Sequence, residues 1–161
     1  MLSKKGLSFA RIKEKLVGGK LVRRLFHSGI GRLKQEKMLS KDLRDLNFIK
    51  IKNSRGEKEA MVCFIVTNNK SWLNLSEGHK TDRLSKKPFM YIDYISVQKN
   101  KSTGLGTQLL LEVVTLAKKQ GVKNVFLDVK KNSRAFRLYK KFGFVEKGQR
   151  NTDFLLMELE I

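Results

Sequence analysis

Two short patterns between residues 101 and 144 carry residue types that can do chemistry. The first, residues 101–107 (KSTGLGT), opens an apolar helix pattern and holds Gly104 and Gly106. Glycine lets the backbone adopt positive φ and approach a ligand closely, and a helix start leaves several NH groups without partners. These NH groups and the helix dipole favour a bound anion such as a diphosphate. On its own, this pattern also fits a strand-to-helix turn that holds no ligand.

The second pattern is residues 132–144 (NSRAFRLYKKFGF), which follow an apolar strand pattern. It places Asn132 as the cap at a helix start, Tyr139 within the helix and Gly143 at its end. A phenol stays protonated at neutral pH, so Tyr139 can donate a proton to a leaving group. The structural alternatives are a helix cap for Asn132 and a core aromatic for Tyr139.

Composition indicates one globular domain over residues 1–161, with a basic, mainly helical part (1–46) and a sheet core (47–161). The single cysteine, Cys63, cannot form an internal disulfide, and its alternation with apolar neighbours predicts core packing. No apolar run reaches the length of a membrane span, and no His, Cys or carboxylate cluster has metal-ligand spacing. We expect a metal-free cytoplasmic protein, and a homodimer is left open.

The formal charge is +20, which attracts polyanions such as RNA, DNA, acidic proteins or a phosphate-rich cofactor. Residues 1–41 hold twelve Lys or Arg and two acids, a net charge of +10. The net charge could instead serve only general solubility. The basic first residues also resemble an organelle transit peptide.

The residues of the two motifs must be positioned by helices and strands, which the periodicity of apolar residues predicts. A strand is predicted at residues 7–12, amphipathic helices within 13–46, and a hairpin of strands 48–51 and 60–67 around Gly56. A long polar segment, 68–88, precedes a strand at 91–97. The remaining predicted elements are a helix from Gly104 to near Gly121, a strand at 124–129, a helix from Asn132 to Gly143, and a final strand pair at 144–147 and 154–161.

The two motifs in this element order resemble the Gcn5-related N-acetyltransferase (GNAT) family, over residues 90–161 well and 47–67 loosely. The resemblance implies an α/β fold with a mixed, mostly antiparallel sheet, a splayed strand pair that holds coenzyme A, and flanking helices. The glycines that the cradle geometry needs are kept, whereas Lys101, Ser102 and Thr103 depart from the family's usual residues. The connection from Val97 to Lys101 is also one residue shorter than is common in the family.

The resemblance assigns roles to individual residues. Tyr139 would protonate the leaving thiolate of coenzyme A, and Asp93 is the candidate base that takes the proton of the amine. The cosubstrate acetyl-CoA would be bound by Ile95, Val97, Lys101, Ser102, Thr103, Gly104, Leu105, Gly106, Thr107, Asn132, Arg134 and Tyr139.

Asp93 shares a strand face with Ile95 and Val97, but it could instead only bind a cationic substrate or sit at the sheet's edge. His79, Glu59 and Asp128 are weaker candidates for the base. In the family the amine attacks directly in a ternary complex, so Cys63 needs no nucleophilic role. The backbone of Ile95 and Val97 would bind the thioester carbonyl and the pantetheine amides.

Sequence alone leaves the acceptor open. We expect an enzyme that acetylates a primary amine of a small molecule, peptide or protein. One alternative is an RNA-directed acetyltransferase acting on an aminoacyl-tRNA amine, and another is an inactive module that binds nucleic acid or ribosomes. Trp72, Tyr91 and Tyr94 are potential stacking aromatics, although a structural role is favoured because no known RNA-binding module accompanies them.

Overall fold

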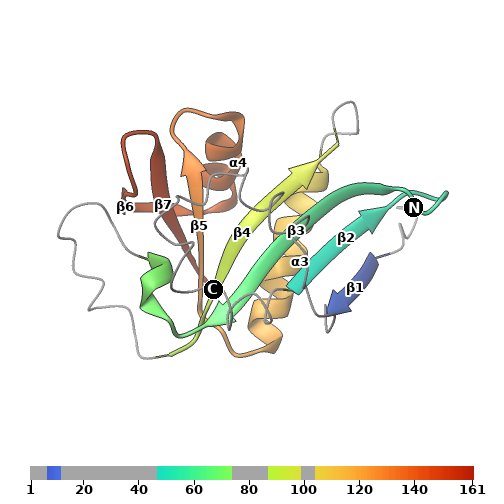
Figure 1. Ribbon diagram of the computed structural model, residues 1–161, viewed down its shortest axis with the longest axis horizontal. Helices are drawn as coiled ribbons and strands as arrows, with labels where there is room; N and C mark the ends of the chain where they lie inside the picture. Colours follow the sequence, from blue (N-terminus) through green and yellow to red (C-terminus); the bar gives the residue numbers. More distant parts are fainter. Residues whose placement is uncertain (1–6, 12–46, 74–86, 99–103) are drawn as a thin grey trace, which may run out of the picture. The chain divides into compact units, whose positions relative to one another are not determined.

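A computed structural model describes residues 7–11, 47–73, 87–98 and 104–161 (Figure 1). The helices expected within residues 13–46 and the cradle residues 101–103 lie outside the described residues. Contacts group the chain into two compact units, Met1–Ile65 with Asp93–Gly106, and Val66–Ile92 with Thr107–Ile161. Each unit is described by itself. The expectation of one domain over residues 1–161 stays a prediction.

Ten elements are described, and they follow the order expected from the sequence. They are β1 (Leu7–Arg11), β2 (Asn47–Lys52), β3 (Lys58–Thr67), the 3-10 helix η3 (Lys70–Leu73), β4 (Phe89–Val97), α3 (Leu105–Lys119), β5 (Asn124–Lys130), α4 (Arg134–Phe142), β6 (Val145–Gln149) and β7 (Phe154–Glu160).

The strands are hydrogen-bonded in the order β1-β2-β3-β4-β5-β7-β6. The β4–β5 pairing is parallel, whereas β1–β2, β2–β3, β5–β7 and β6–β7 are antiparallel. The mixed, mostly antiparallel sheet expected for the GNAT fold is therefore confirmed.

The first unit contains the predicted hairpin of β2 and β3. In its turn, the Asn53 side chain accepts hydrogen bonds from the backbone NH groups of Arg55 and Glu57, both at 2.9 Å. Gly56 has φ +79°, a conformation that glycine adopts without strain. Apolar side chains of both strands are buried, among them Ile51, which is fully shielded from solvent. A local Asx turn and a hydrophobic face therefore fix the register of this hairpin.

The second unit contains the first half of β4 together with β5, β7 and β6. The parallel ladder joins Met90, Tyr91 and Ile92 to Val125, Phe126 and Leu127 respectively, and its last pair is Ile92 with Leu127. Asp128 is the first residue of β5 beyond this ladder. On its other side, β5 pairs with β7 along its whole length, from Asn124 with Glu160 to Lys130 with Phe154. Within this unit, β5 is therefore held between the first half of β4 and β7.

Both helices end at a glycine, as the sequence predicts. Beyond α3, Gly121 has φ +68°, and the NH of Val122 bonds to the carbonyl of Ala117 at 2.9 Å. Beyond α4, Gly143 has φ +114°, and its NH reaches the carbonyls of Tyr139 and Lys140. Such left-handed caps satisfy carbonyls that would otherwise lack partners.

The predicted start of α4 is wrong by one residue. Ser133, not Asn132, is the N-cap: its φ is −75° and ψ 165°, and its hydroxyl accepts a hydrogen bond from the NH of Phe136 at 3.0 Å. Asn132 has φ +58°, the left-handed conformation that Asn tolerates better than most side chains. The chain therefore turns at Asn132 and enters the helix through Ser133.

In the part of the chain that the structure describes, no helix is both long and apolar enough to cross a lipid bilayer.

Candidate functional site

The helix start at α3 retains the features of an anion cradle in its described part. Gly104 has φ +110°, and the space around a Cβ built there is open to at least 4 Å. The first turn of α3 holds no acidic residue. The Leu105 side chain is buried and anchors this start, while Gly106 is half-buried. The described NH groups of this turn are therefore available to an anion and meet no like charge from their own helix.

The second half of β4, Asp93–Val97, belongs to the same unit as Gly104. The NH of Gln98 donates to the carbonyl of Glu59 at 2.8 Å, so this end of β4 is tied to β3. Asp93 and Ile95 are half-buried, and 38% of Val97 is exposed. Of the three weaker candidates for the base, Glu59 is buried, Asp128 is half-buried in the second unit, and His79 lies outside the described residues.

The thiol of Cys63 is affected by the charge of Asp93. The thiol lies on β3 and is completely buried, and burial raises its pKa, with the negative charge of Asp93 raising it further. A thiol that stays protonated is a poor nucleophile. Cys63 is thus a core residue, as expected, and the Asp93 carboxylate lies close enough to β3 to act on it electrostatically.

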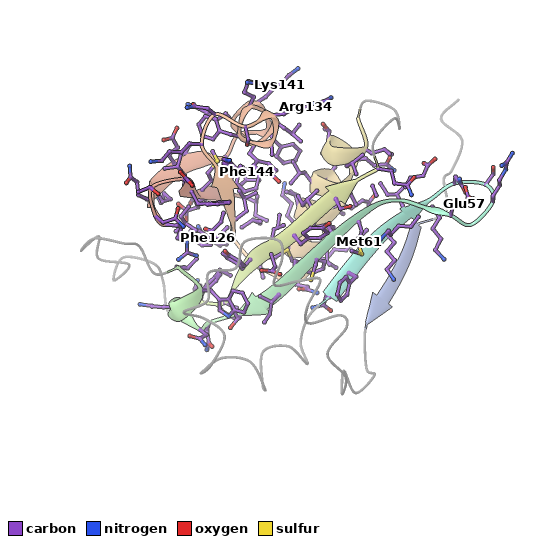
Figure 2. All side chains as sticks on the ribbon, turned by 45° about the horizontal axis from the view of Figure 1, so that its top comes forward. Glu57, Met61, Phe126, Arg134, Lys141 and Phe144 are labelled. Atoms are coloured by element: carbon purple, nitrogen blue, oxygen red, sulfur yellow. The ribbon has the colours of Figure 1, made fainter. Side chains whose placement is uncertain are left out.

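Tyr139 is positioned by the inner face of α4. Its ring is 7% exposed and packs on Phe144 at a centroid distance of 5.7 Å, and Figure 2 shows Phe144 beneath the helix. Burial raises the pKa of this phenol to about 12, so it carries its proton at neutral pH. No described residue hydrogen-bonds the Tyr139 hydroxyl, yet no fully buried side-chain N or O atom of a described residue lacks a partner. The ring is therefore buried while the hydroxyl reaches the surface.

The remaining proposed cofactor residues of the second unit are Thr107, Asn132 and Arg134. Asn132 and Arg134 are exposed at the turn into α4, and Thr107 is half-buried in the first turn of α3. The candidate residues thus fall into two sets. Asp93, Ile95, Val97, Gly104, Leu105 and Gly106 belong to one unit, and Thr107, Asn132, Arg134 and Tyr139 to the other.

Sequence reasoning missed a polar cluster in the second unit, which we call the Tyr91 cluster: Trp72, Tyr91, Asp128 and Arg150. The Tyr91 hydroxyl donates to Asp128 Oδ2 at 2.8 Å, and Arg150 Nε donates to Asp128 Oδ1 at 2.7 Å. Arg150 Nη2 also donates to the Trp72 carbonyl and lies 3.4 Å from the Tyr91 hydroxyl. The rings of Trp72 and Tyr91 lie 5.1 Å apart.

The contacts of Arg150 favour its charged guanidinium. Burial lowers the pKa of Arg150, but the charge of Asp128 and the contact with Tyr91 outweigh it, so the net direction is upward. Trp72 and Tyr91 are buried, as their expected structural role requires. A carboxylate in the otherwise apolar strand around Asp128 was the one sequence signal for the cluster; nothing local pointed to Arg150.

Within the described residues, no group of His, Cys, Asp and Glu side chains could hold a metal ion.

Comparisons with known proteins agree with this architecture. The sequence model of the acetyltransferase (GNAT) family matches residues 33–144. Two solved structures resemble nearly the whole chain. An IAA acetyltransferase from Bacillus cereus has 16% identity and a TM-score of 0.60, covering 97% of this chain and 100% of its own. A GNAT acetyltransferase from Elizabethkingia anophelis with acetyl-CoA bound also has 16% identity, with a TM-score of 0.59 and 97% of each chain covered.

A third structure, NAA60 of Arabidopsis thaliana in complex with acetyl-CoA, has 21% identity and a TM-score of 0.55, covering 73% of this chain and 77% of its own. At these identities the structures show a shared fold. A search of curated protein sequences found no match.

Proposed function

Because the chain belongs to the acetyltransferase (GNAT) family, we propose that it moves the acetyl group of acetyl-CoA to a primary amine by direct attack in a ternary complex. The observation that carries the proposal is Tyr139: a protonated phenol with a buried ring and an accessible hydroxyl, held at the position that resembles the family's general acid. Two solved structures with the same fold, from Elizabethkingia and Arabidopsis, contain acetyl-CoA.

In this proposal the cosubstrate is held mainly by backbone groups. The NH groups from Thr103 to Thr107 would bind the diphosphate, together with the side chains of Lys101 and Ser102. The first turn of α3 holds no acidic residue that would repel it. Asn132 and Arg134, exposed at the start of α4, would contact the pantetheine arm and a phosphate. The backbone of Ile95 and Val97 would bind the pantetheine amides and the thioester carbonyl.

The chemistry then needs two proton transfers. Asp93 takes a proton from the ammonium form of the acceptor, and the neutral amine attacks the thioester carbon to form a C–N bond. A backbone NH at the carbonyl oxygen stabilises the negative charge of the tetrahedral intermediate. When the C–S bond breaks, Tyr139 gives its proton to the leaving thiolate, and the second amine proton leaves to solvent.

Calorimetry and a thiol-release assay test this proposal. The protein should bind acetyl-CoA and release free thiol with at least one amine among spermidine, a tripeptide with a free α-amine and an Nα-blocked lysine peptide. Asp93→Asn should lower kcat on the order of a hundredfold while the Kd of acetyl-CoA stays unchanged. Absence of acetyl-CoA binding would refute the enzymatic proposal and leave the inactive binding module.

The surface of α4 favours an RNA-linked amine as a second candidate acceptor. Four of the nine residues of this helix are basic and none is acidic. Arg134, Arg137, Lys140 and Lys141 are all exposed, and Figure 2 shows Arg134 and Lys141 at the outer side of the helix. Lys140 Nζ lies 3.5 Å from Glu146 and 5.5 Å from the Phe136 ring, which is half-buried. Cations around an accessible aromatic ring suit phosphates and stacked bases.

Filter binding to a labelled single-stranded RNA, at several salt concentrations, tests this second candidate. Arg137→Gln/Lys141→Gln should weaken binding and lower the salt slope by roughly two, one unit for each lost phosphate contact. Lys118→Gln/Lys119→Gln, at the end of α3, is the control with the same change in charge. Saturating coenzyme A should leave RNA binding in place; full competition would mean that the surface serves only the phosphates of the cosubstrate.

A further inference from the structure

The β6–β7 turn of the second unit is short and internally hydrogen-bonded. The Arg150 NH donates to the Phe154 carbonyl at 2.9 Å, which leaves residues 151–153 as the turn itself. The Asn151 side chain accepts hydrogen bonds from the backbone NH groups of Asp153 and Phe154, both at 2.9 Å. Such an Asx turn fixes the backbone that follows the asparagine. All three turn residues are exposed, so hydrogen bonds rather than core packing define the shape of the turn.

A buried ion pair attaches the start of this turn to β5. Arg150 Nε donates to Asp128 Oδ1 at 2.7 Å, and only 8% of the Arg150 side chain is exposed. A buried ion pair adds little net stability compared with apolar residues of similar volume, because both charges lose their hydration. What the guanidinium adds is direction, since the same side chain also donates to the Trp72 carbonyl. The ion pair therefore fixes the position of the β6–β7 turn on β5.

The end of the β6–β7 turn is hydrogen-bonded to the β5–α4 turn, residues 130–133. The Lys131 NH donates to the Asp153 carbonyl at 2.9 Å, one residue beyond the end of the β5–β7 ladder. The bond within the β5–α4 turn, from the Ser133 NH to the Lys130 carbonyl, is longer, at 3.3 Å. The β5–α4 turn is therefore held by its neighbour as well as by its own hydrogen bond.

Asn132, the third residue of the β5–α4 turn, has a conformation that needs such support. Its φ of +58° is unfavourable for side chains in general, although asparagine tolerates it better than most. In the proposed function this exposed residue contacts the cosubstrate. If the turn were not held beforehand, binding of acetyl-CoA would also have to order it, and the affinity would fall.

We infer that the β6–β7 turn is a positioning element for the cosubstrate and that Asn151 is its positioning residue. The Asn151 side chain orders the turn, and the Asp153 carbonyl then holds the NH of Lys131. Asn132 thereby keeps the backbone conformation in which it contacts acetyl-CoA. The inference rests on the proposed function. It concerns the affinity for acetyl-CoA and not the chemical step, because Asn132 has no part in the proposed proton transfers.

Calorimetry with acetyl-CoA and amide hydrogen exchange measured by NMR test the inference. Asn151→Ala removes both side-chain hydrogen bonds of the turn, so the Lys131 amide should exchange faster. The Kd of acetyl-CoA should rise about fivefold, the equivalent of roughly one hydrogen bond. The kcat at saturating acetyl-CoA should stay within about twofold of the wild type. Asn151→Asp keeps a side-chain acceptor at the same place and should restore both the exchange rate and the Kd.

Asn53→Ala is the matched control, because Asn53 accepts hydrogen bonds from two backbone NH groups of the β2–β3 turn, also at 2.9 Å. Both alanine variants should lose a similar free energy of unfolding, and only Asn151→Ala should lose affinity. If Asn151→Ala lost no more affinity than Asn53→Ala, the positioning role would be wrong and the proposed function would stand. If the wild type bound no acetyl-CoA, the proposed function would fail and the positioning role would fail with it.

Discussion

Replacing Tyr139 by Phe removes one hydroxyl oxygen. The surroundings of this oxygen predict a small effect on stability and a large effect on activity. The hydroxyl has no described hydrogen-bond partner, so its loss should change the free energy of unfolding at pH 7 by less than about 1 kcal/mol. As the proposed general acid, the same hydroxyl should be worth roughly 10² to 10⁴ in kcat. The variant should therefore be folded, bind acetyl-CoA normally and turn over slowly.

Alkaline pH gives this substitution a second signature. Burial raises the pKa of Tyr139 from 10.0 to about 12 in the folded protein. Above pH 10 the unfolded chain loses the proton first, so the stabilisation present below pH 10 is lost as pH rises toward 12. At one pH unit above the unfolded pKa the loss is about 1.4 kcal/mol, and the full difference of two units corresponds to roughly 2.7 kcal/mol. Tyr139→Phe lacks this loss.

Two measurements check these expectations. Thiol release between pH 7 and 9 gives kcat, and urea unfolding at pH 8 and pH 11 gives the free energy of unfolding. Tyr94→Phe removes the corresponding hydroxyl from a tyrosine of β4 and is the control for general effects of losing a phenol. If Tyr139→Phe kept the kcat of the wild type, the general-acid role would be wrong. If its stability fell between pH 8 and pH 11 as much as that of the wild type, the buried environment of the phenol would be wrong.

Two further substitutions probe the turns around the proposed site. Ser133→Ala should lower the free energy of unfolding by about 1 kcal/mol in urea denaturation, because the Phe136 NH loses its cap, whereas Asn132→Gly should leave it nearly unchanged at φ +58°; equal losses would contradict the assignment of the cap. Gly104→Ala meets no atoms within 4 Å but strains φ +110°, so it should weaken acetyl-CoA binding about tenfold by calorimetry. Gly56→Ala, equally open at φ +79°, is the control that should lose stability and keep the affinity.

Much of the fold could be predicted because its signals are local. The hairpin of β2 and β3 follows from alternating apolar residues and a turn of polar residues and glycine, and α3 and α4 follow from helical periodicity closed by Gly121 and Gly143. The cap of α4 was misplaced because Asn132 and Ser133 are adjacent residues of equal capping ability. Only the backbone conformation, φ +58° against −75°, separates them.

The candidate site was only partly predictable for a different reason. Tyr139 and Gly104 stand in short motifs, so their roles could be proposed from spacing. The contacts of the Tyr91 cluster join residues 37, 22 and 59 positions apart in the chain. Such distances leave no periodicity to detect, and Arg150 looks like any other basic residue in a chain of charge +20. Three-dimensional packing alone identifies it as the partner of Asp128.

The burial of Cys63 has a practical consequence for single-molecule and fluorescence work. It is the only thiol in the sequence and is completely shielded from solvent, with a pKa raised by burial and by Asp93. Maleimide dyes react with accessible thiolates, so the native protein should stay unlabelled without any cysteine having to be removed. Arg55→Cys, in the exposed β2–β3 turn, would then carry a single fluorophore in an otherwise native chain.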